Sequence, residues 1–398
     1  MRKDFLFTSE SVTEGHPDKL CDQISDAIVD HFLEQDPYAR IIAECAVAKG
    51  IVFIATRFAA RASVDLAQVA RRVIQQVGYV DDSTFNARDC TVMTSITELP
   101  MSQYSAVDEN TLSEHELDRL GAKNQSNAFG YACNQTPALL PLPIWLAHRL
   151  ARRLSAARLE RRLTYLLPDG TTQVGVEYRD GKPQRIHSIA LVASHTANVP
   201  DLDELRRALR DEVIVDVFRN EVIRPDGDTQ IFVNPDGPFV GGGPASHAGL
   251  TGRKTGVDSY GEYARNSESA LSGKHPLRID RVGAYAARYA AKNVVAAQLA
   301  EECEVQLSYS IGLAHPVSIE VETFGTGRIA DDAITTLLEQ HFDFRVGGIV
   351  KQFNLRHLPR QVKGGFYRKL AAYGHVGRMD IGLPWEKTDR AHMLAQAL

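Results

Sequence analysis

The chain has 398 residues, of which 44% are hydrophobic and 24% charged, and its formal net charge is −5. This composition is typical of a globular protein of two or three domains and excludes a disordered or fibrous chain. No apolar run approaches the ~20 residues that a membrane helix needs. Mild net acidity argues against a nucleic-acid-binding surface. We therefore expect neither a membrane nor a nucleic acid as a partner.

The cysteines point to a reducing compartment. They are odd in number, widely spaced and without a C-x-x-C pair, which is typical of buried thiols rather than of disulfides or a zinc site. The N-terminus leads into a strand within a few residues and carries no visible secretory signal. We therefore expect a cytoplasmic protein. The five thiols belong to Cys21, Cys45, Cys90, Cys133 and Cys303.

The first motif in chain order is the segment 14–19, Glu-Gly-His-Pro-Asp-Lys, which follows an apolar strand and opens an amphipathic helix. A helix N-terminus gathers free backbone N–H groups and the positive end of the helix dipole. With His16, Asp18 and Lys19 placed there, the segment favours a cradle for a polyphosphate and its Mg²⁺. The alternative is a solvated turn in which the Asp caps the helix.

A pattern of two strands followed by a helix of roughly four turns occurs three times. Its second strands begin at Ile51, Ile186 and Val317, so the period is near 130 residues. That period is too long for a solenoid and predicts three α+β units, each a sheet covered by helices on one face. The predicted elements are 41–47, 51–58 and 64–77; 173–178, 186–194 and 202–218; and 305–311, 317–323 and 330–342. A further Ala-rich helix, suited to close packing, is predicted over 282–299.

A second informative region is the Gly-rich segment 239–254, which ends in Arg253 and Lys254. Three consecutive glycines permit positive φ and let the backbone approach a ligand closely. The adjacent cations, and further on Lys274 and the segment 278–281, indicate a second phosphate-binding wall. Cations mixed with a few carboxylates in an acidic chain are typical of a polyanion bridged by metal.

These segments together resemble the S-adenosylmethionine synthetase family over nearly the whole chain. The family joins the sulfur of methionine to C5′ of ATP and expels triphosphate, which is hydrolysed to pyrophosphate and phosphate. The blocks that carry the resemblance are 7–19, 22–27, 129–132, 249–254, 280–281, 284–294, 321–326, 372–375 and 384–389.

The resemblance implies three repeated α+β domains about a pseudo-threefold axis. It also implies a homodimer or tetramer whose sheets pack face to face, with active sites at the subunit interface. By this resemblance the N-terminal domain with the ATP and metal motif spans 1–101 and a gating loop spans 102–126. The central domain spans 127–233 and the C-terminal domain 234–398, and the domains interleave in space.

The resemblance also implies roles for single residues. His16 stabilises the departing oxygen, Phe239 stacks on adenine, and Asp169 lies near the reacting centre. Two Mg²⁺ ions and a K⁺ ion are implied, with Asp18 and Asp280 as Mg²⁺ ligands and Glu44 at the monovalent-cation or metal site. The residues that hold the triphosphate are Arg253, Lys254, Lys274 and Arg278, and the catalytic set is His16, Lys274, Arg253 and Asp169.

The chain departs from the family where the amino-acid substrate is expected. A family Glu that faces the methionine ammonium is Arg57 here, so the charge reverses. Other family residues are replaced by Leu99 (Gln), Asn124 (Asp), Thr171 (Lys) and His247 (Asp), and a family Lys is Arg278. The residues assigned to triphosphate, metal and adenine are largely retained.

Four interpretations follow. The first is a methionine adenosyltransferase with a rebuilt methionine pocket. The second is the same transfer to another acceptor, one with an anionic group near Arg57 and His247. The others are an ATP-binding regulatory homologue and a Mg²⁺-dependent triphosphatase. The Arg-rich helix 149–162 is interpreted as a solvated face or an interface.

Overall fold

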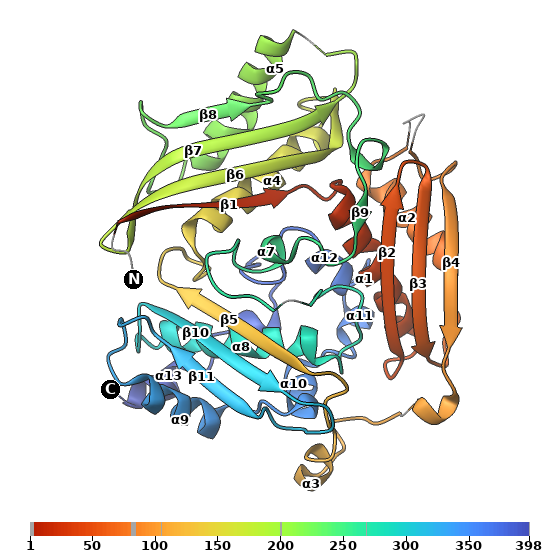
Figure 1. Ribbon diagram of the computed structural model, residues 1–398, viewed down its shortest axis with the longest axis vertical. Coiled ribbons are helices and arrows are strands. Elements are labelled where there is room, and N and C mark those ends of the chain that lie inside the picture. Colours follow the sequence, from red (N-terminus) through yellow and green to blue (C-terminus); the bar gives the residue numbers. More distant parts are fainter. Residues whose placement is uncertain (1–3, 81–84, 105, 200, 268, 398) are drawn as a thin grey trace.

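Three β-sheets surround a set of central helices (Figure 1). The computed structural model describes residues 4–80, 85–104, 106–199, 201–267 and 269–397. The predicted domains 1–101, 127–233 and 234–398 and the predicted loop 102–126 therefore each include positions outside the described residues.

The first sheet has the strand order β1-β6-β7-β8. It joins β1 (Phe5–Val12) to the long hairpin of β6 (Leu166–Arg179) and β7 (Lys182–His195), and β8 (Gln230–Val233) adds a parallel edge. Helix α4 (Leu142–Leu159) packs against β1 and β6. The register sets Val12 opposite Thr171, so β1 delivers the chain to one end of this sheet just before residue 16.

The second sheet has the order β4-β3-β2-β9, with β3 and β4 parallel and the other pairs antiparallel. Alternate residues of its strands are buried against helices, while the other face is open. Cys45 and Ile54, which pair across β2 and β3, are buried, whereas Phe53 is 41% and Met93 51% exposed. The elements are β2 (Arg40–Ala48), β3 (Ile51–Ala59), β4 (Thr91–Glu98), β9 (Gly249–Leu250), α1 (Pro17–Gln35) and α2 (Leu66–Val77).

The third sheet is antiparallel, with the order β11-β10-β5. Helix α8 (Ile279–Ala296) lies across β5 (Ser126–Cys133) and β10 (Glu302–Tyr309), and β11 (Ser318–Glu322) forms the edge. Almost every residue of α8 is buried, as its small Ala-rich sequence predicts. Helix α9 (Asp331–His341) covers β11.

The structure confirms the three repeated units and the α+β fold class, because each predicted strand pair and following helix is present. One difference concerns the helix predicted over 202–218. It forms as α5 (Leu202–Leu209), a π-helical stretch (Arg210–Val215) and a last turn, α6 (Asp216–Phe218). The π stretch widens the helix locally, which a 3.6-residue periodicity does not predict.

Short helices and 3₁₀ turns complete the connections. In the predicted loop 102–126, a capping box at Ser113 and Glu116 starts a helix of one turn. The remaining elements are η1 (Met101–Gln103), α3 (Glu114–Leu117), η3 (Gly243–Ala245), α7 (Thr255–Asp258), α10 (Val346–Phe353), α11 (Leu358–Gln361), α12 (Tyr367–Leu370), η4 (Pro384–Glu386), α13 (Ala391–Leu394) and η5 (Ala395–Ala397).

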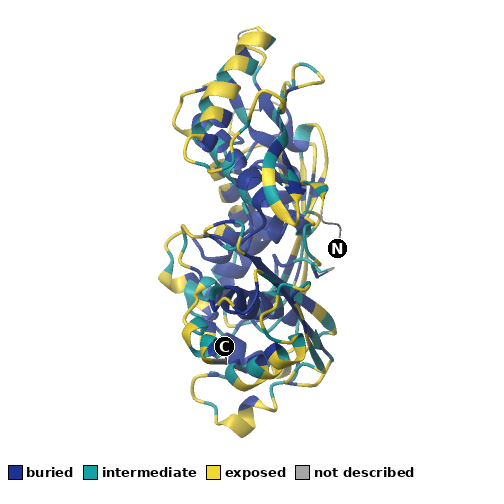
Figure 2. Cartoon of the chain, turned by 90° about the vertical axis from the view of Figure 1, so that its left-hand side faces the viewer, coloured by how far each residue is buried: buried dark blue, intermediate teal, exposed yellow. Residues whose placement is uncertain are grey.

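Buried residues run along the whole length of the molecule in the side view (Figure 2). One hydrophobic cluster joins the second and third sheets through α1 and α8, and a second lies between α4, β6, β7 and α5. Among the described residues, none of the helices combines the length and the apolar character that a bilayer span requires. The arginines of α4 are largely paired with carboxylates, Arg153 with Glu160, Glu212 and Asp216, which agrees with the interpretation of this helix as a solvated face or an interface.

Candidate active site

The end of β1 and the start of α1 meet at a tight turn. His16 is the N-cap of α1, and its Nδ1 accepts a hydrogen bond from the backbone N–H of Asp18 at 3.2 Å. Pro17 follows at the first helical position, where its missing N–H costs nothing. Gly15 is required here, because a Cβ on it would lie 2.3 Å from the backbone of Pro168. The turn is therefore pinned against the β6 end of the first sheet.

His16 is buried, and this determines its charge. Burial lowers the pKa of its imidazole to about 4, although the carboxylates of Asp169 and Asp18 oppose that shift. The ring is therefore neutral at neutral pH. Because Nδ1 accepts a hydrogen bond, the proton of the neutral ring is on Nε2. His16 thus presents one N–H donor to the space beside it.

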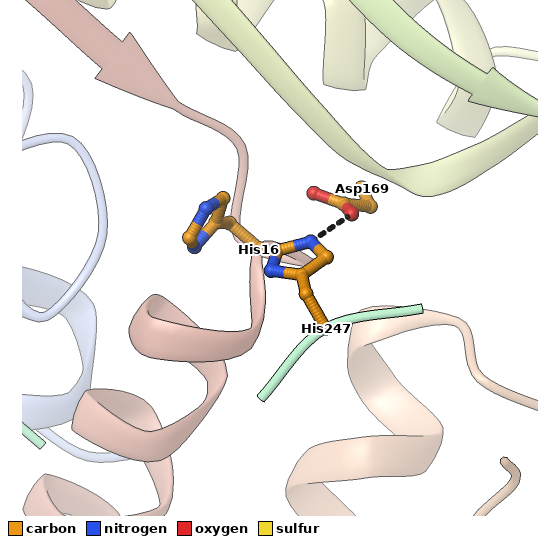
Figure 3. Close-up of side chains that lie close together, drawn as sticks. All are labelled: His16, Asp169 and His247. Carbon is orange, nitrogen blue, oxygen red and sulfur yellow. Dashed lines mark hydrogen bonds and ion pairs between the residues drawn. The ribbon is translucent and has the colours of Figure 1, made fainter. Parts of the chain in front are cut away.

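Asp169 and His247 form a hydrogen-bonded pair beside His16 (Figure 3). Asp169 is 3% exposed, and its Oδ2 accepts from the backbone N–H of Gly243 at 2.7 Å and from Nε2 of His247 at 2.9 Å. The hydrogen bond to Asp169 raises the pKa of His247. The rings of His16 and His247 lie edge to face, with centroids 5.0 Å apart.

This arrangement depends on backbone from two distant segments. Gly243 has a φ of +62°, and a Cβ there would lie 2.3 Å from the hydroxyl of Tyr79. The same hydroxyl donates to the carbonyl of Gly15 at 2.5 Å. Tyr79 therefore links the His16 turn to the Gly-rich segment. The three consecutive glycines predict positive φ at Gly243, but nothing in the sequence near Tyr79 indicates that its hydroxyl contacts Gly243 and Gly15.

The cations of the Gly-rich segment lie on the same side as Asp18. The backbone N–H of Leu250 donates to Oδ1 of Asp18 at 2.9 Å, and Nη1 of Arg253 lies 3.5 Å from that oxygen. Lys254 pairs with Glu10 of β1. Arg253 is exposed and Asp18 is buried, so a ligand that reaches Arg253 also meets the edge of the Asp18 carboxylate.

A second group of polar side chains surrounds the carboxylate of Asp280, in the first turn of α8. Asp280 is fully buried, with Lys274 at 3.7 Å, Arg278 at 3.3 Å and a hydrogen bond from Asn124 at 2.8 Å. Burial lowers the pKa of Lys274, while Asp280 opposes that shift. Within the described residues, Oδ2 of Asp280 accepts no hydrogen bond. The same oxygen lies 3.3 Å from Nη2 of Arg278 and 3.7 Å from Nζ of Lys274, so two cations already pair with it. A carboxylate oxygen is also the kind of ligand that a hard divalent cation such as Mg²⁺ prefers.

Lys19 does not line the phosphate cradle that the segment 14–19 predicts, so that expectation is wrong. Its ammonium is fully buried between the carboxylates of Asp22, at 2.8 Å, and Asp258. Asp22 also accepts from the backbone N–H of Gly252 at 2.8 Å. Lys19 therefore ties α1 to the segment that follows the Gly-rich turn. Its position at i+3 from Asp22 was the signal available in the sequence.

The structure brings together only part of the predicted set. His16, Asp169 and His247 form one cluster, Asp18 and Arg253 a second pair, and Asp280, Lys274, Arg278 and Asn124 a third group. Phe239 is half-buried, with its backbone N–H and C=O both bonded to His195. Thr171 is half-buried in β6, two residues after Asp169, and Leu99 follows β4.

Arg57 and Glu44 belong to the open face of the second sheet. Both side chains are exposed, Arg57 on β3 opposite Ile42 and Glu44 on β2 opposite Ala55. Phe53, on the same face, is also exposed. Within one chain these two charged residues therefore lie on a surface with apolar neighbours.

Comparison with known families gives three consecutive matches. Models described as "S-adenosylmethionine synthetase, N-terminal domain", "central domain" and "C-terminal domain" match residues 4–100, 119–239 and 241–387.

Several curated proteins are similar over the full length. A protein of Synechococcus elongatus, named S-adenosylmethionine synthase, is 49% identical, covering 100% of this chain and 98% of that protein. Proteins of the same name from Microcystis aeruginosa and Thermosynechococcus vestitus are 49% and 48% identical. They cover 100% and 99% of this chain, and 99% and 98% of their own lengths.

Proposed function

The chain belongs to the S-adenosylmethionine synthetase family, and we infer from this that it joins the sulfur of methionine to C5′ of ATP. The products are S-adenosylmethionine, pyrophosphate and phosphate. The observation that best supports this chemistry is His16, a buried neutral imidazole with its proton on Nε2, on which the charges of Asp169, Asp18 and Lys254 all act.

We propose that His16 donates its Nε2 proton, as a hydrogen bond, to O5′ of ATP as the C5′–O5′ bond breaks. The electron pair of that bond passes to the triphosphate oxygen while the sulfur lone pair forms the new bond to C5′. A neutral donor suits this role because it meets charge that develops in the transition state. No covalent intermediate with the protein is needed, so the rate must come from orientation and electrostatics.

Four cations are proposed to hold the triphosphate. Lys274 and Arg278 flank Asp280, and Arg253 lies beside Asp18, so each group of cations is anchored by a buried carboxylate. Lys254 follows Arg253 directly in the chain and is the fourth proposed cation. We assign adenine stacking to Phe239. Arg253, Lys274, His16 and Asp169 form the proposed catalytic set.

Asp18 and Asp280 are the proposed ligands of Mg²⁺, two ions in all. When bound, Mg²⁺ would offset the charge of the triphosphate. The buried Oδ2 of Asp280, which accepts no hydrogen bond within the described residues, supports this assignment, and the exposed carboxylate of Glu44 supports a separate K⁺ or metal site.

We propose that the working unit is a homodimer, alone or paired into a tetramer. The open face of the second sheet carries exposed Ile51, Phe53 and Met93, an apolar surface that a second copy would cover. Arg57 and Glu44 lie on this face and would then face the partner subunit. We also propose a cytoplasmic location, which agrees with five cysteines that are all free and buried.

The acceptor half of the site is where an alternative function has support. Arg57, Leu99, Asn124, Thr171 and His247 replace the residues that the family resemblance assigns to methionine. A non-methionine acceptor with an anionic group is the second candidate, because Arg57 and His247 add positive charge. A triphosphatase or a regulatory homologue would use only the ATP half.

The testing experiment incubates the purified protein with ATP, Mg²⁺, K⁺ and methionine and follows the products by mass spectrometry. We expect S-adenosylmethionine at an enzymatic rate from the native chain. His16→Asn keeps the helix cap but lacks the Nε2–H, so it should bind ATP and form little product. Triphosphate hydrolysis without an adenosylated product would instead favour the triphosphatase. Binding of ATP without turnover would favour the regulatory homologue.

A further inference from the structure

The pair formed by Asp169 and His247 has the geometry of a base held by a carboxylate. Because Nε2 of His247 donates to Asp169, the neutral ring has its lone pair on Nδ1. In the part of the chain that the structure describes, Nδ1 makes no hydrogen bond. The side chain is 40% exposed, whereas Asp169 is 2% exposed, so the base is accessible and its orienting partner is fixed. A carboxylate in this position holds the tautomer and stabilises the imidazolium that forms.

Adenosyl transfer to methionine gives this base nothing to do. A thioether sulfur carries no proton, and the departing oxygen is already met by His16. A base is useful only when the attacking atom loses a proton as its new bond forms.

The position of the pair suits an attacking group. In an in-line displacement the attacking atom approaches to about 3 to 3.5 Å from carbon, so it lies about 5 Å from the leaving oxygen. The rings of His16 and His247 are 5.0 Å apart at their centroids. The two imidazoles are therefore close enough for both to act on one displacement, His16 at the leaving oxygen and His247 at the attacking group.

The strength of the base selects the class of nucleophile. The hydrogen bond to Asp169 raises the pKa of His247 above that of an ordinary imidazole, which brings it closer to that of an ordinary thiol, about 8.5. Ammonium groups, at about 10, and alcohols are much poorer matches. Beyond Asp169, the charged groups that act on His247 are Asp18, which raises its pKa, and Lys254, which lowers it; His16 is neutral.

We propose that this site also transfers the adenosyl group of ATP to a thiol, with His247 as the base and Asp169 as its positioning partner. This rests on the proposed adenosyl transfer. The thiol sulfur forms a bond to C5′, the C5′–O5′ bond breaks, and its electron pair leaves with the triphosphate. The S–H proton passes to Nδ1 of His247 and then to solvent. The products are a neutral 5′-thioether of adenosine, triphosphate or its hydrolysis products, and one proton.

The test uses homocysteine, the thiol that differs from methionine only in lacking the S-methyl group. The native protein is incubated with ATP, Mg²⁺, K⁺ and either homocysteine or methionine, and S-adenosylhomocysteine and S-adenosylmethionine are measured by mass spectrometry between pH 6 and 9. We expect both products. His247→Gln keeps an N–H donor for Asp169 but is not a base, so the homocysteine rate at pH 6.5 should fall about 100-fold.

The pH dependence separates a base from a structural role. Above pH 8.5 the free thiolate needs no base, so the ratio of native to His247→Gln rates should fall towards that seen with methionine. The matched control is His315→Gln, because His315 also bonds to an aspartate, Asp118, at 3.1 Å, but on the surface with 66% of its side chain exposed. It should match the native protein with both substrates.

Each outcome decides between the two proposals. Formation of S-adenosylmethionine without S-adenosylhomocysteine would overturn the thiol inference and leave the proposed function intact. Formation of the thioether alone would support the inference and remove methionine as the substrate. A native-to-variant ratio that is the same at every pH would overturn the role of His247 as a base.

Discussion

The side-chain amide of Asn124 donates a hydrogen bond to Oδ1 of Asp280, 2.8 Å away and 156 residues along the chain. This contact ties the segment before β5 to the first turn of α8, where Lys274 and Arg278 also meet Asp280. A neutral donor leaves the Asp280 charge for those cations and for a metal. The residue at position 124 should therefore determine how strongly the stability of the region around Asp280 depends on Mg²⁺.

Asn124→Asp should make the stability of the protein more dependent on Mg²⁺. Two carboxylates in contact repel by roughly 1 to 4 kcal/mol, depending on screening, and a divalent cation relieves that repulsion. We expect a lower Tm than that of the native chain in EDTA and a larger rise on adding Mg²⁺, measured by differential scanning fluorimetry. Asn127→Asp, at an exposed position of β5, is the matched control. Equal Mg²⁺ effects in both variants and the native chain would contradict a metal at Asp280.

Lys19→Met should be strongly destabilising. Removing one partner from a buried ion group leaves uncompensated charge and typically costs about 3 to 5 kcal/mol. In Lys19→Met, both Asp22 and Asp258 would lose their buried cation. The control is Lys387→Met, at an exposed position, which should change the free energy of unfolding little. Urea denaturation measures both variants.

The same variant makes a second prediction, about pH. Burial raises the pKa of Asp22 and of Asp258, and Lys19 opposes that rise. Without Lys19 the folded state holds protons more tightly than the unfolded state, so lowering the pH should restore part of the lost stability. Lys19→Met should therefore be closer to the native chain in free energy of unfolding at pH 5 than at pH 8. The same difference at both pH values would argue against unpaired carboxylates.

His16→Asn tests the neutral state of His16 through stability. The pKa of His16 is about 4 in the folded protein, against about 6.5 for an unfolded chain. Below pH 6.5 the unfolded state binds a proton that the folded state does not, so acidification stabilises the unfolded state. The penalty grows by about 1.4 kcal/mol per pH unit and levels off near pH 4.

The native chain should therefore lose stability faster than His16→Asn between pH 6.5 and 4.5, by about 2 to 3 kcal/mol in all, in urea denaturation at several pH values. Burial also lowers the pKa of His148, His275 and His375, and these groups act equally in both proteins. If the free energy of unfolding falls with pH equally in the two proteins, then His16 is not held neutral by burial.

The parts of the fold that the sequence predicts are those with a local signal. The strands at 41–47 and 51–58 alternate apolar residues towards α1 and α2, and the structure extends them only to Arg40–Ala48 and Ile51–Ala59. The π-helical stretch at Arg210–Val215 has no such signal, because it arises where one turn adapts to its packing.

The candidate site shows the same limit. The turn at His16 and the cations at Arg253 and Lys254 are visible as motifs. The bond between Asp169 and His247 spans 78 residues, and the burial of Lys19 depends on Asp258, 239 residues away. Such pairs form only when the sheets assemble, so residue type and spacing do not reveal which ammonium faces a ligand and which is neutralised inside the protein.

Phe53→Asp should weaken the proposed dimer. Phe53 and Met93 lie opposite each other on β3 and β4, and both are exposed in the single chain. A carboxylate at the centre of an apolar interface must lose its water without gaining a partner. We expect a shift from dimer to monomer in analytical ultracentrifugation and a parallel loss of activity. Val222→Asp, at a loop position that is 98% exposed, should leave both unchanged.

Arg57→Glu tests which acceptor the pocket prefers. If Arg57 faces the ammonium of methionine in the partner subunit's site, the native charge repels the substrate, and reversal turns repulsion into attraction. At ~1 to 4 kcal/mol per close charge pair, the KM for methionine should fall at least about tenfold, measured by initial rates of S-adenosylmethionine formation. Arg72→Glu makes the same charge reversal at an exposed position of α2, on the helix-covered side of the sheet, and should leave KM unchanged. A KM for methionine that is unchanged or higher in Arg57→Glu would mean that Arg57 does not contact the ammonium, and would favour a methionine pocket rebuilt with compensating partners.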